Sequence, residues 1–247
     1  MKSLLKALGA LPFRLMPTRV VQRVIGLGLY ATSRRHPVAA VRALLDVEHV
    51  LSGYIDEAGM RYEGGIHPKH RLTRYHDFFV ERVKAGERVL DIGCGYGAVA
   101  HSVATRAGAV VIGIDLSAAN VTHARRRFVH AGLTFVVGDA TRDIPEGRFD
   151  VVIASNIMEH LEDRVRFYRT VQERARPSRW LVRVPAEDRD WRVPLRRELG
   201  LFAFSDPTHV TEYTRQSFEA EARAAGFAVV EAQVNWGEIW AELRPRA

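Results

Sequence analysis

Cysteine is nearly absent from the sequence: Cys94 is the only one among 247 residues. A single thiol cannot form a disulfide within the chain, and it falls short of the thiolates that a cysteine-based structural zinc site needs. The composition is otherwise ordinary, with 47% hydrophobic and 26% charged residues, which argues against disordered, collagen-like and low-complexity proteins. We therefore expect a folded protein of a reducing compartment, and we assign it to the cytoplasm.

Long apolar runs and early acidic residues are also missing. The apolar stretch 24–32 is far shorter than the roughly 20 residues that a membrane-spanning helix needs. The first 45 residues contain no acidic side chain and eight basic ones, which leaves 28 basic against 29 acidic residues in the rest of the chain. Because the excess positive charge is confined to one terminal segment, we expect a docking face and no nucleic-acid partner.

Residues 1–66 predict a basic, amphipathic helical extension. Leu4, Leu8, Leu11 and Leu15 repeat at helical spacing, with Lys2 and Lys6 on the opposite face. A further helix is predicted from Pro37 to about Gly59, with an apolar face that we expect to be buried: Val41, Leu44, Leu45, Leu51, Tyr54 and Ile55. Three interpretations stay open: residues 1–35 contact an anionic membrane, they form a targeting segment, or the helices cap the core.

The remainder, residues 67–247, reads as one α/β domain. Short apolar runs at 88–92, 109–115, 134–137, 149–154 and 180–184 alternate with amphipathic stretches. This rhythm predicts a doubly wound, mostly parallel sheet with helices on both faces. Ligands of such sheets bind at the carboxyl ends of the strands.

A glycine-rich turn follows the first predicted strand. The run Asp91-Ile92-Gly93-Cys94-Gly95-Tyr96-Gly97 lets the backbone bend sharply and approach a ligand closely. Asp115 ends the second strand, where its carboxylate could accept hydrogen bonds from a ribose diol. Asp139 follows the third strand, and its carboxylate could accept a hydrogen bond from an adenine amino group. Three acids thus stand at three successive strand ends.

These motifs resemble those of class I S-adenosylmethionine-dependent methyltransferases, over roughly residues 68–242. The resemblance implies a seven-stranded Rossmann-like sheet that ends in a hairpin over 227–243, and S-adenosyl-L-methionine as the cofactor. The implied cofactor-binding residues are Asp91, Gly93, Cys94, Gly95, Gly97, Asp115, Leu116, Asp139, Ala140, Ser155, Asn156 and Tyr75.

Two alternatives remain at this point. Gly93, Gly95 and Ala98 also satisfy the dinucleotide-binding fingerprint, with Asp115 at about the right distance, so an NAD(P)-dependent oxidoreductase is the rival enzyme. Asp91, Asp139 and the terminal hairpin favour the methyltransferase. The second alternative is a non-catalytic, membrane-associated module that only binds the cofactor.

Catalytic candidates lie beyond the fourth strand and in the loop 185–213. His160 is the first choice for a general base, because an imidazole titrates near neutral pH, and Glu159 is the second. His209 is a further candidate. In the same loop Arg189, Arg192, Arg196 and Arg197 could recognise a phosphate or carboxylate, or belong to a solvated helix 191–199 with ion pairs such as Arg192 with Glu198.

The segment around Glu159 also resembles the ubiquinone-biosynthesis O-methyltransferases, which carry Glu-x-x-Glu-His and are associated with a divalent metal. Here Asn156 replaces the first carboxylate, which removes one hard anionic ligand. The histidines at 67–76 lack a clear metal-binding spacing. We therefore expect no metal, and methylation at an oxygen of a small-molecule, lipid-linked or glycan-linked acceptor.

Overall fold

The computed structural model describes residues 12–246, which form two compact units. The smaller unit comprises residues up to 67 together with 196–202, and the larger unit comprises 68–195 and 203 onward. The predicted leucine repeat at positions 4, 8 and 11 lies outside the described residues.

The smaller unit is built from two helices, α2 (Thr18–Ser33) and α3 (Pro37–Tyr62), which pack against each other. Pro37 starts α3 as predicted, since proline fits the first helical turn. The predicted buried face of α3 is wrong over its second half: Leu51, Tyr54 and Ile55 are 54%, 57% and 60% exposed. The reason is that the segment 196–202 meets α3 further toward its N-terminus, at Leu45, Glu48 and His49.

Among the described residues, no helix combines the length and the apolar character that crossing a bilayer requires.

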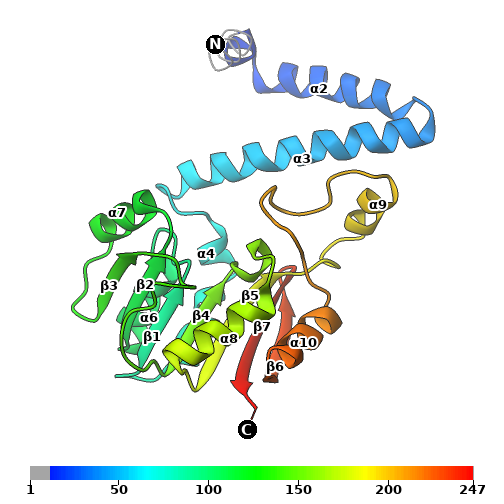
Figure 1. Cartoon of the computed structure of the whole chain (residues 1–247). Helices are drawn as coiled ribbons and strands as arrows, with labels where there is room; N and C mark the ends of the chain where they lie inside the picture. The colour runs from blue at the N-terminus through cyan, green and yellow to red at the C-terminus, as the bar shows by residue number, and fades with distance from the viewer. Residues whose placement is uncertain (1–11, 247) are drawn as a thin grey trace. The chain divides into compact units, whose positions relative to one another are not determined.

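The larger unit contains a seven-stranded sheet (Figure 1). Its strands are β1 (Arg88–Ile92), β2 (Val110–Asp115), β3 (Leu133–Val137), β4 (Val151–Ser155), β5 (Arg179–Pro185), β6 (Phe227–Asn235) and β7 (Glu238–Pro245). The order is β3-β2-β1-β4-β5-β7-β6, in which β7 is antiparallel to β5 and to β6. The expected doubly wound, mostly parallel fold is confirmed, and each of the first five strands lies within two residues of its predicted bounds.

Helices cover both faces of this sheet. They are α4 (Lys69–Leu72), α5 (Tyr75–Val80), α6 (Ala98–Ala107), α7 (Ala118–Arg127), the 3-10 turn η1 (Met158–His160), α8 (Arg164–Ala175) and α10 (Arg215–Ala224); α9 (Arg192–Glu198) ends in the smaller unit. One core lies between the sheet and α8 and α10, around Trp180 and Tyr168. The other lies under α5, α6 and α7, around Phe79 and Phe135.

This topology positions the candidate site. The chain order of the strands reverses between β1 and β4, and such a switch point leaves a crevice at the carboxyl ends of the strands. Asp91, Asp115, Ser155 and Arg183 all lie at or near these ends.

Candidate active site

The glycine turn joins β1 to α6 with three residues in the left-handed region. Gly93, Gly95 and Gly97 have φ of 63°, 53° and 81°. Gly97 also needs the space, because a Cβ there would lie 2.5 Å from the ring of Phe135. The turn therefore requires glycine for its conformation, and at Gly93 and Gly97 for close packing as well, since a Cβ at Gly93 would lie 1.9 Å from Ile157 Cδ1.

Asp115 is fixed by backbone amides. Its Oδ2 accepts from Gly95 N at 2.8 Å, and its Oδ1 accepts from Ser117 N at 2.9 Å and from Asn120 Nδ2 at 3.2 Å. The carboxylate thus ties the glycine turn to the start of α7. A carboxylate oxygen can accept more than one hydrogen bond, so Oδ2 can also accept one from a hydroxyl group of a ligand.

Asp139 is fixed in a similar way. Its Oδ1 accepts from Thr141 Oγ1 at 2.6 Å and from Thr141 N at 2.8 Å, and Arg142 forms an ion pair with it. The hydrogen bonds from Thr141 and the charge of Arg142 hold the pKa of Asp139 below its usual range. The carboxylate is therefore charged at neutral pH and able to accept a hydrogen bond from a ligand.

A cavity of about 300 Å³ lies between these acids. Six of the predicted site residues line it: Gly93, Asp115, Leu116, Asp139, Ala140 and His160. Its remaining lining is mostly apolar and includes Ile92, Ile114, Ile157, Leu161 and Phe167. A mostly apolar cavity with carboxylates at defined places is suited to a nucleoside, whose base packs on apolar side chains while its polar groups donate.

The other predicted cofactor residues lie around the turn and do not line this cavity. Asp91 is buried, its Oδ2 has no hydrogen-bond partner, and burial raises its pKa to about 7. Asn156 has φ of 56° and a buried Oδ1 without a partner. Two unpaired acceptors beside the glycine turn fit a ligand that brings its own donors, such as the amino group of S-adenosylmethionine.

Cys94 and Tyr75 have packing roles in the structure. The Cys94 side chain fills the space over Gly113, and burial raises the pKa of its thiol. Tyr75 lies beneath the guanidinium of Arg183, whose Cζ is 3.6 Å from the centre of the ring, and burial raises the pKa of Tyr75 to about 12. Ser155 ends β4 beside Arg183.

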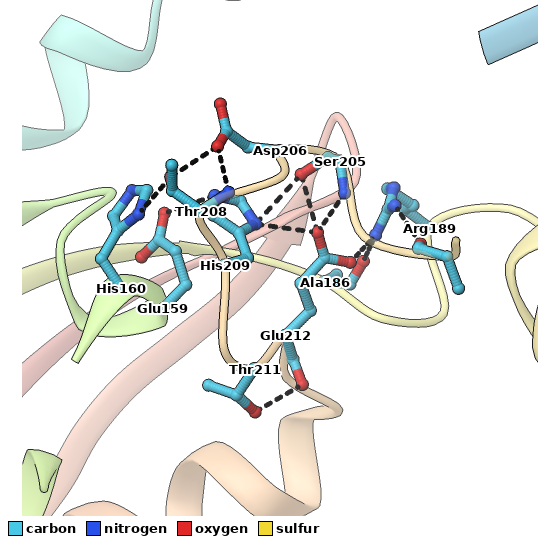
Figure 2. A network of polar contacts seen from close by, with 11 residues as sticks. Glu159, His160, Ala186, Arg189, Ser205, Asp206, Thr208, His209, Thr211 and Glu212 are labelled. Carbon is cyan, nitrogen blue, oxygen red and sulfur yellow. Dashed lines mark hydrogen bonds and ion pairs between the residues drawn. The ribbon is translucent and has the colours of Figure 1, made fainter. Parts of the chain in front are cut away.

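The three catalytic candidates come together beyond β4 (Figure 2). Glu159 is fully buried, neither carboxylate oxygen has a hydrogen-bond partner, and burial raises its pKa to about 8. His160 reaches the cavity, and its Nδ1 lies 2.9 Å from Thr208 Oγ1. His209 Nε2 is 3.9 Å from Glu159 Oε1. The ligand atoms of all three lie within 4.8 Å of one another, so these residues could hold a metal ion.

Glu212 holds His209 in place and was missed by sequence reasoning. Its Oε1 lies 3.0 Å from His209 Nδ1 and accepts from Ser205 N and Oγ, while its Oε2 is paired with Arg189. Although burial raises it, these hydrogen bonds and the charge of Arg189 bring the pKa of Glu212 below its usual value. The residue is therefore a charged anchor for the imidazole.

Arginines of the loop 185–213 are used within the protein. Arg189 pairs with Glu212, and Arg192 pairs with Asp190. Asp190 lies just before the helix and accepts from both the side chain and the backbone of Arg192, and the pair of Arg192 with Glu198 stays a prediction.

Arg183 is a second residue that sequence reasoning missed. It is 4% exposed, and its Nε and Nη1 have no hydrogen-bond partner; the carboxylate of Glu238 lies 3.6 Å from Nη1. The available signal was a charged residue inside the apolar run 180–185.

The family model described as "Methyltransferase domain" matches residues 65–232. The chain belongs to this methyltransferase family. The resemblance to class I S-adenosylmethionine-dependent methyltransferases is thereby confirmed, and with it S-adenosylmethionine as the cofactor of the domain. The comparisons do not support the oxidoreductase or the non-catalytic module.

Curated relatives match only part of the methyltransferase. The ubiquinone biosynthesis O-methyltransferase of Chromobacterium violaceum is 32% identical over 121 residues, 46% of this chain and 51% of that protein. Phosphoethanolamine N-methyltransferase 1 of Arabidopsis thaliana is 33% identical over 105 residues, 40% of this chain and 21% of that protein. The chain thus spans about half the length, or less, of these relatives.

Among solved structures, magnesium protoporphyrin IX methyltransferase of Synechocystis, with bound SAH, is similar with a TM-score of 0.56 and 20% identity, covering 70% of this chain and 83% of that one. At this identity the likeness supports the fold alone.

Proposed function

We propose that this protein transfers a methyl group from S-adenosylmethionine to an oxygen of a small-molecule, lipid-linked or glycan-linked acceptor. The observation that carries the proposal is the position of His160, which lines the same cavity as Asp115 and Asp139. One cavity thus joins the acids suited to an adenosine with a group able to accept a proton.

Each part of the site has a proposed role in binding. Asp115 holds the ribose and Asp139 the adenine amino group, while Leu116 and Ala140 pack on the base. The glycine turn, Asp91 and the Ser155–Asn156 segment hold the methionine end. When bound, S-adenosylmethionine supplies an electrophilic methyl group on a positively charged sulfur.

The Glu159, His160 and His209 side chains support an oxygen acceptor. An alcohol or phenol must lose its proton as it attacks the methyl carbon, so a proton acceptor beside the reacting oxygen accelerates the reaction. His160 takes that proton directly. Thr208 orients the ring at Nδ1, the ring of His209 packs edge-on against it, and the carboxyl group of Glu159 lies beside both. Burial lowers the pKa of His160, which leaves the imidazole neutral and ready to accept.

The relatives named above act, by their names, on different acceptors, so they do not decide the substrate. We propose no nucleic-acid acceptor, since the excess positive charge is confined to the first 45 residues. A lipid-linked acceptor is supported by α2, whose Val20, Val24 and Leu27 are exposed beside Arg19 and Arg23. Such a face suits contact of residues 1–35 with an anionic membrane.

The test is transfer of labelled methyl groups from S-adenosylmethionine into an extract of the source cell, fractionated into lipid, glycan, nucleic-acid, protein and small-molecule pools. We expect label in the lipid, glycan or small-molecule pool. The labelled product should be stable to mild acid and should not react with reagents for amines, as expected of a methyl ether. The His160→Ala variant is the inactive control, and His130→Ala, an exposed histidine before β3, is the active one. Label only in nucleic acid or protein would refute the proposal.

A further inference from the structure

The second half of α3 has an apolar stripe that is open to solvent. At 100° per residue, seven of its side chains fall on one side of the helix: Val47, Val50, Leu51, Tyr54, Ile55, Ala58 and Tyr62. All of these except Ala58 are between 46% and 82% exposed. The stripe is about 22 Å long at 1.5 Å per residue. Monomeric soluble proteins rarely expose a contiguous apolar surface of this kind, which is typical of an interaction site.

The charges beside the stripe do not suit an anionic membrane. α3 contains two arginines and four acidic residues, and three of these acids border the stripe: Asp46 and Glu57 on one edge and Glu48 on the other. Anionic headgroups would therefore meet negative charge on both sides of the stripe. In contrast, α2 has two arginines and no acidic residue. The membrane contact proposed above thus belongs to α2, and the stripe of α3 suits a protein surface.

A second copy of α3 in antiparallel orientation fits this stripe. With a two-fold axis through the midpoint between Tyr54 and Ile55, each position faces the one at the same distance on the other side of the midpoint. Leu51 and Val50 then face small residues, which lets the side chains of the two helices interdigitate. The facing pairs are Tyr54 with Ile55, Leu51 with Ala58, Val50 with Gly59, and Val47 with Tyr62.

Two charged residues favour the same orientation. Asp46 and Arg61 border the same edge of the stripe near its opposite ends, so antiparallel packing brings Asp46 of one copy beside Arg61 of the other. The two-fold axis forms this pair twice. Within residues 12–246, Asp46 has no ion pair, and Arg61 pairs only with Glu57, at 3.5 Å and in full contact with solvent. A parallel arrangement would place like charges beside each other.

We propose that the second half of α3 is a dimer interface, through which two copies of this chain pack antiparallel about the midpoint between Tyr54 and Ile55. The apolar stripes of the two copies cover each other, and Asp46 and Arg61 fix the direction. The interface uses neither α2 nor any residue of the candidate active site. It is therefore independent of methyl transfer and of its acceptor.

The experiment is sedimentation equilibrium of the full chain without detergent, from about 1 to about 200 µM. We expect an equilibrium between monomer and dimer, with no larger species, because a two-fold interface closes on itself. Leu51→Glu should weaken dimerisation at least about 10-fold, since it places a carboxylate in the apolar contact. Met60→Glu is the matched control: Met60 is exposed on the opposite side of α3, so this variant should dimerise as the parent does.

Charge reversal tests the orientation of the two helices. Asp46→Arg and Arg61→Asp should each weaken dimerisation about 5 to 10-fold, and the double variant should return to within about 3-fold of the parent. Both positions are exposed, so these variants supply a measurement even if Leu51→Glu fails to fold, which its melting temperature and its binding of S-adenosylhomocysteine would reveal. A double variant as weak as the single ones would overturn the antiparallel arrangement.

Three further results would overturn the proposal. The chain could stay monomeric over the whole concentration range, which would mean that the stripe contacts another part of its own chain. The parent and Leu51→Glu could dimerise equally, which would place the interface on another surface. A monomeric chain could bind anionic vesicles and lose that binding in Leu51→Glu, which would assign the stripe to a membrane.

Discussion

The two halves of the site differ in how their polar groups are satisfied. On the side of β2 and β3, Asp115 and Asp139 accept hydrogen bonds from residues close to them in the chain, such as Ser117 and Thr141. On the side of β4 and β5, Glu159 and Arg183 are buried with polar atoms that have no hydrogen-bond partner. The first half is thus complete before a ligand binds, whereas the second half has buried polar atoms that a ligand could pair with.

The largest effect is expected on turnover, and it should distinguish the half of the site that reacts from the half that binds the cofactor. His160→Ala should lower turnover by about 10² to 10⁴-fold, the usual contribution of a positioned proton acceptor. Affinity for S-adenosylhomocysteine should change little, because Asp115 and Asp139 are untouched. Single-turnover kinetics and calorimetry measure the two quantities. Parent-like turnover would show that the reaction needs no group at position 160.

Asp91 is an exception to the difference between the two halves. It belongs to the glycine turn, but one of its buried carboxylate oxygens has no hydrogen-bond partner. Burial raises the pKa of Asp91 to about 7, well above that of an aspartate in an unfolded chain, so the folded state binds the proton more tightly than the unfolded state. Its contribution to stability is therefore complete below about pH 4 and is lost as pH rises through about 7, by roughly 4 kcal/mol in total.

Asp91→Asn should remove this dependence. Without cofactor, the variant should be more stable than the parent at pH 8 and show a smaller fall in the free energy of unfolding between pH 5 and pH 8. Urea unfolding at several pH values measures both. Identical pH profiles would mean that Asp91 is ionised in the folded protein and has a partner.

The glycine turn offers a matched pair for stability. Gly97→Ala should destabilise the protein by about 2 to 3 kcal/mol, because the residue has positive φ and its new methyl group meets the Phe135 ring. Gly95→Ala shares the positive φ, but a Cβ there meets nothing within 4 Å, so it should cost about 1 kcal/mol. Equal melting temperatures for the two variants would show that the Phe135 ring moves aside freely.

The same contrast explains what the sequence could predict. Asp91, Asp115 and Asp139 each follow or end an apolar run, so strand order and strand ends place them together without side-chain detail. His209 was a candidate from the sequence, but its position beside Glu159 and the role of Glu212 were not predictable, because their loop follows a path that depends on tertiary contacts such as Arg189 with Glu212. The exposed half of α3 was mispredicted for a related reason: an apolar stripe indicates a face that can be buried, but not which element covers it.

Asp115 tests whether the half of the site on the side of β2 and β3 recognises a ligand. Asp115→Ala should weaken binding of S-adenosylhomocysteine by about 1 to 3 kcal/mol, the cost of losing a charged acceptor for the ribose. Part of that loss would come from the Gly95 amide, which Asp115 now holds. Asn120→Ala is the control, because it removes one hydrogen bond to Asp115 and leaves the carboxylate in place. If both variants weaken binding equally, the loss comes from the missing Asn120 contact at the start of α7 and the ribose role is refuted; if only Asp115→Ala does, the carboxylate itself is required for binding.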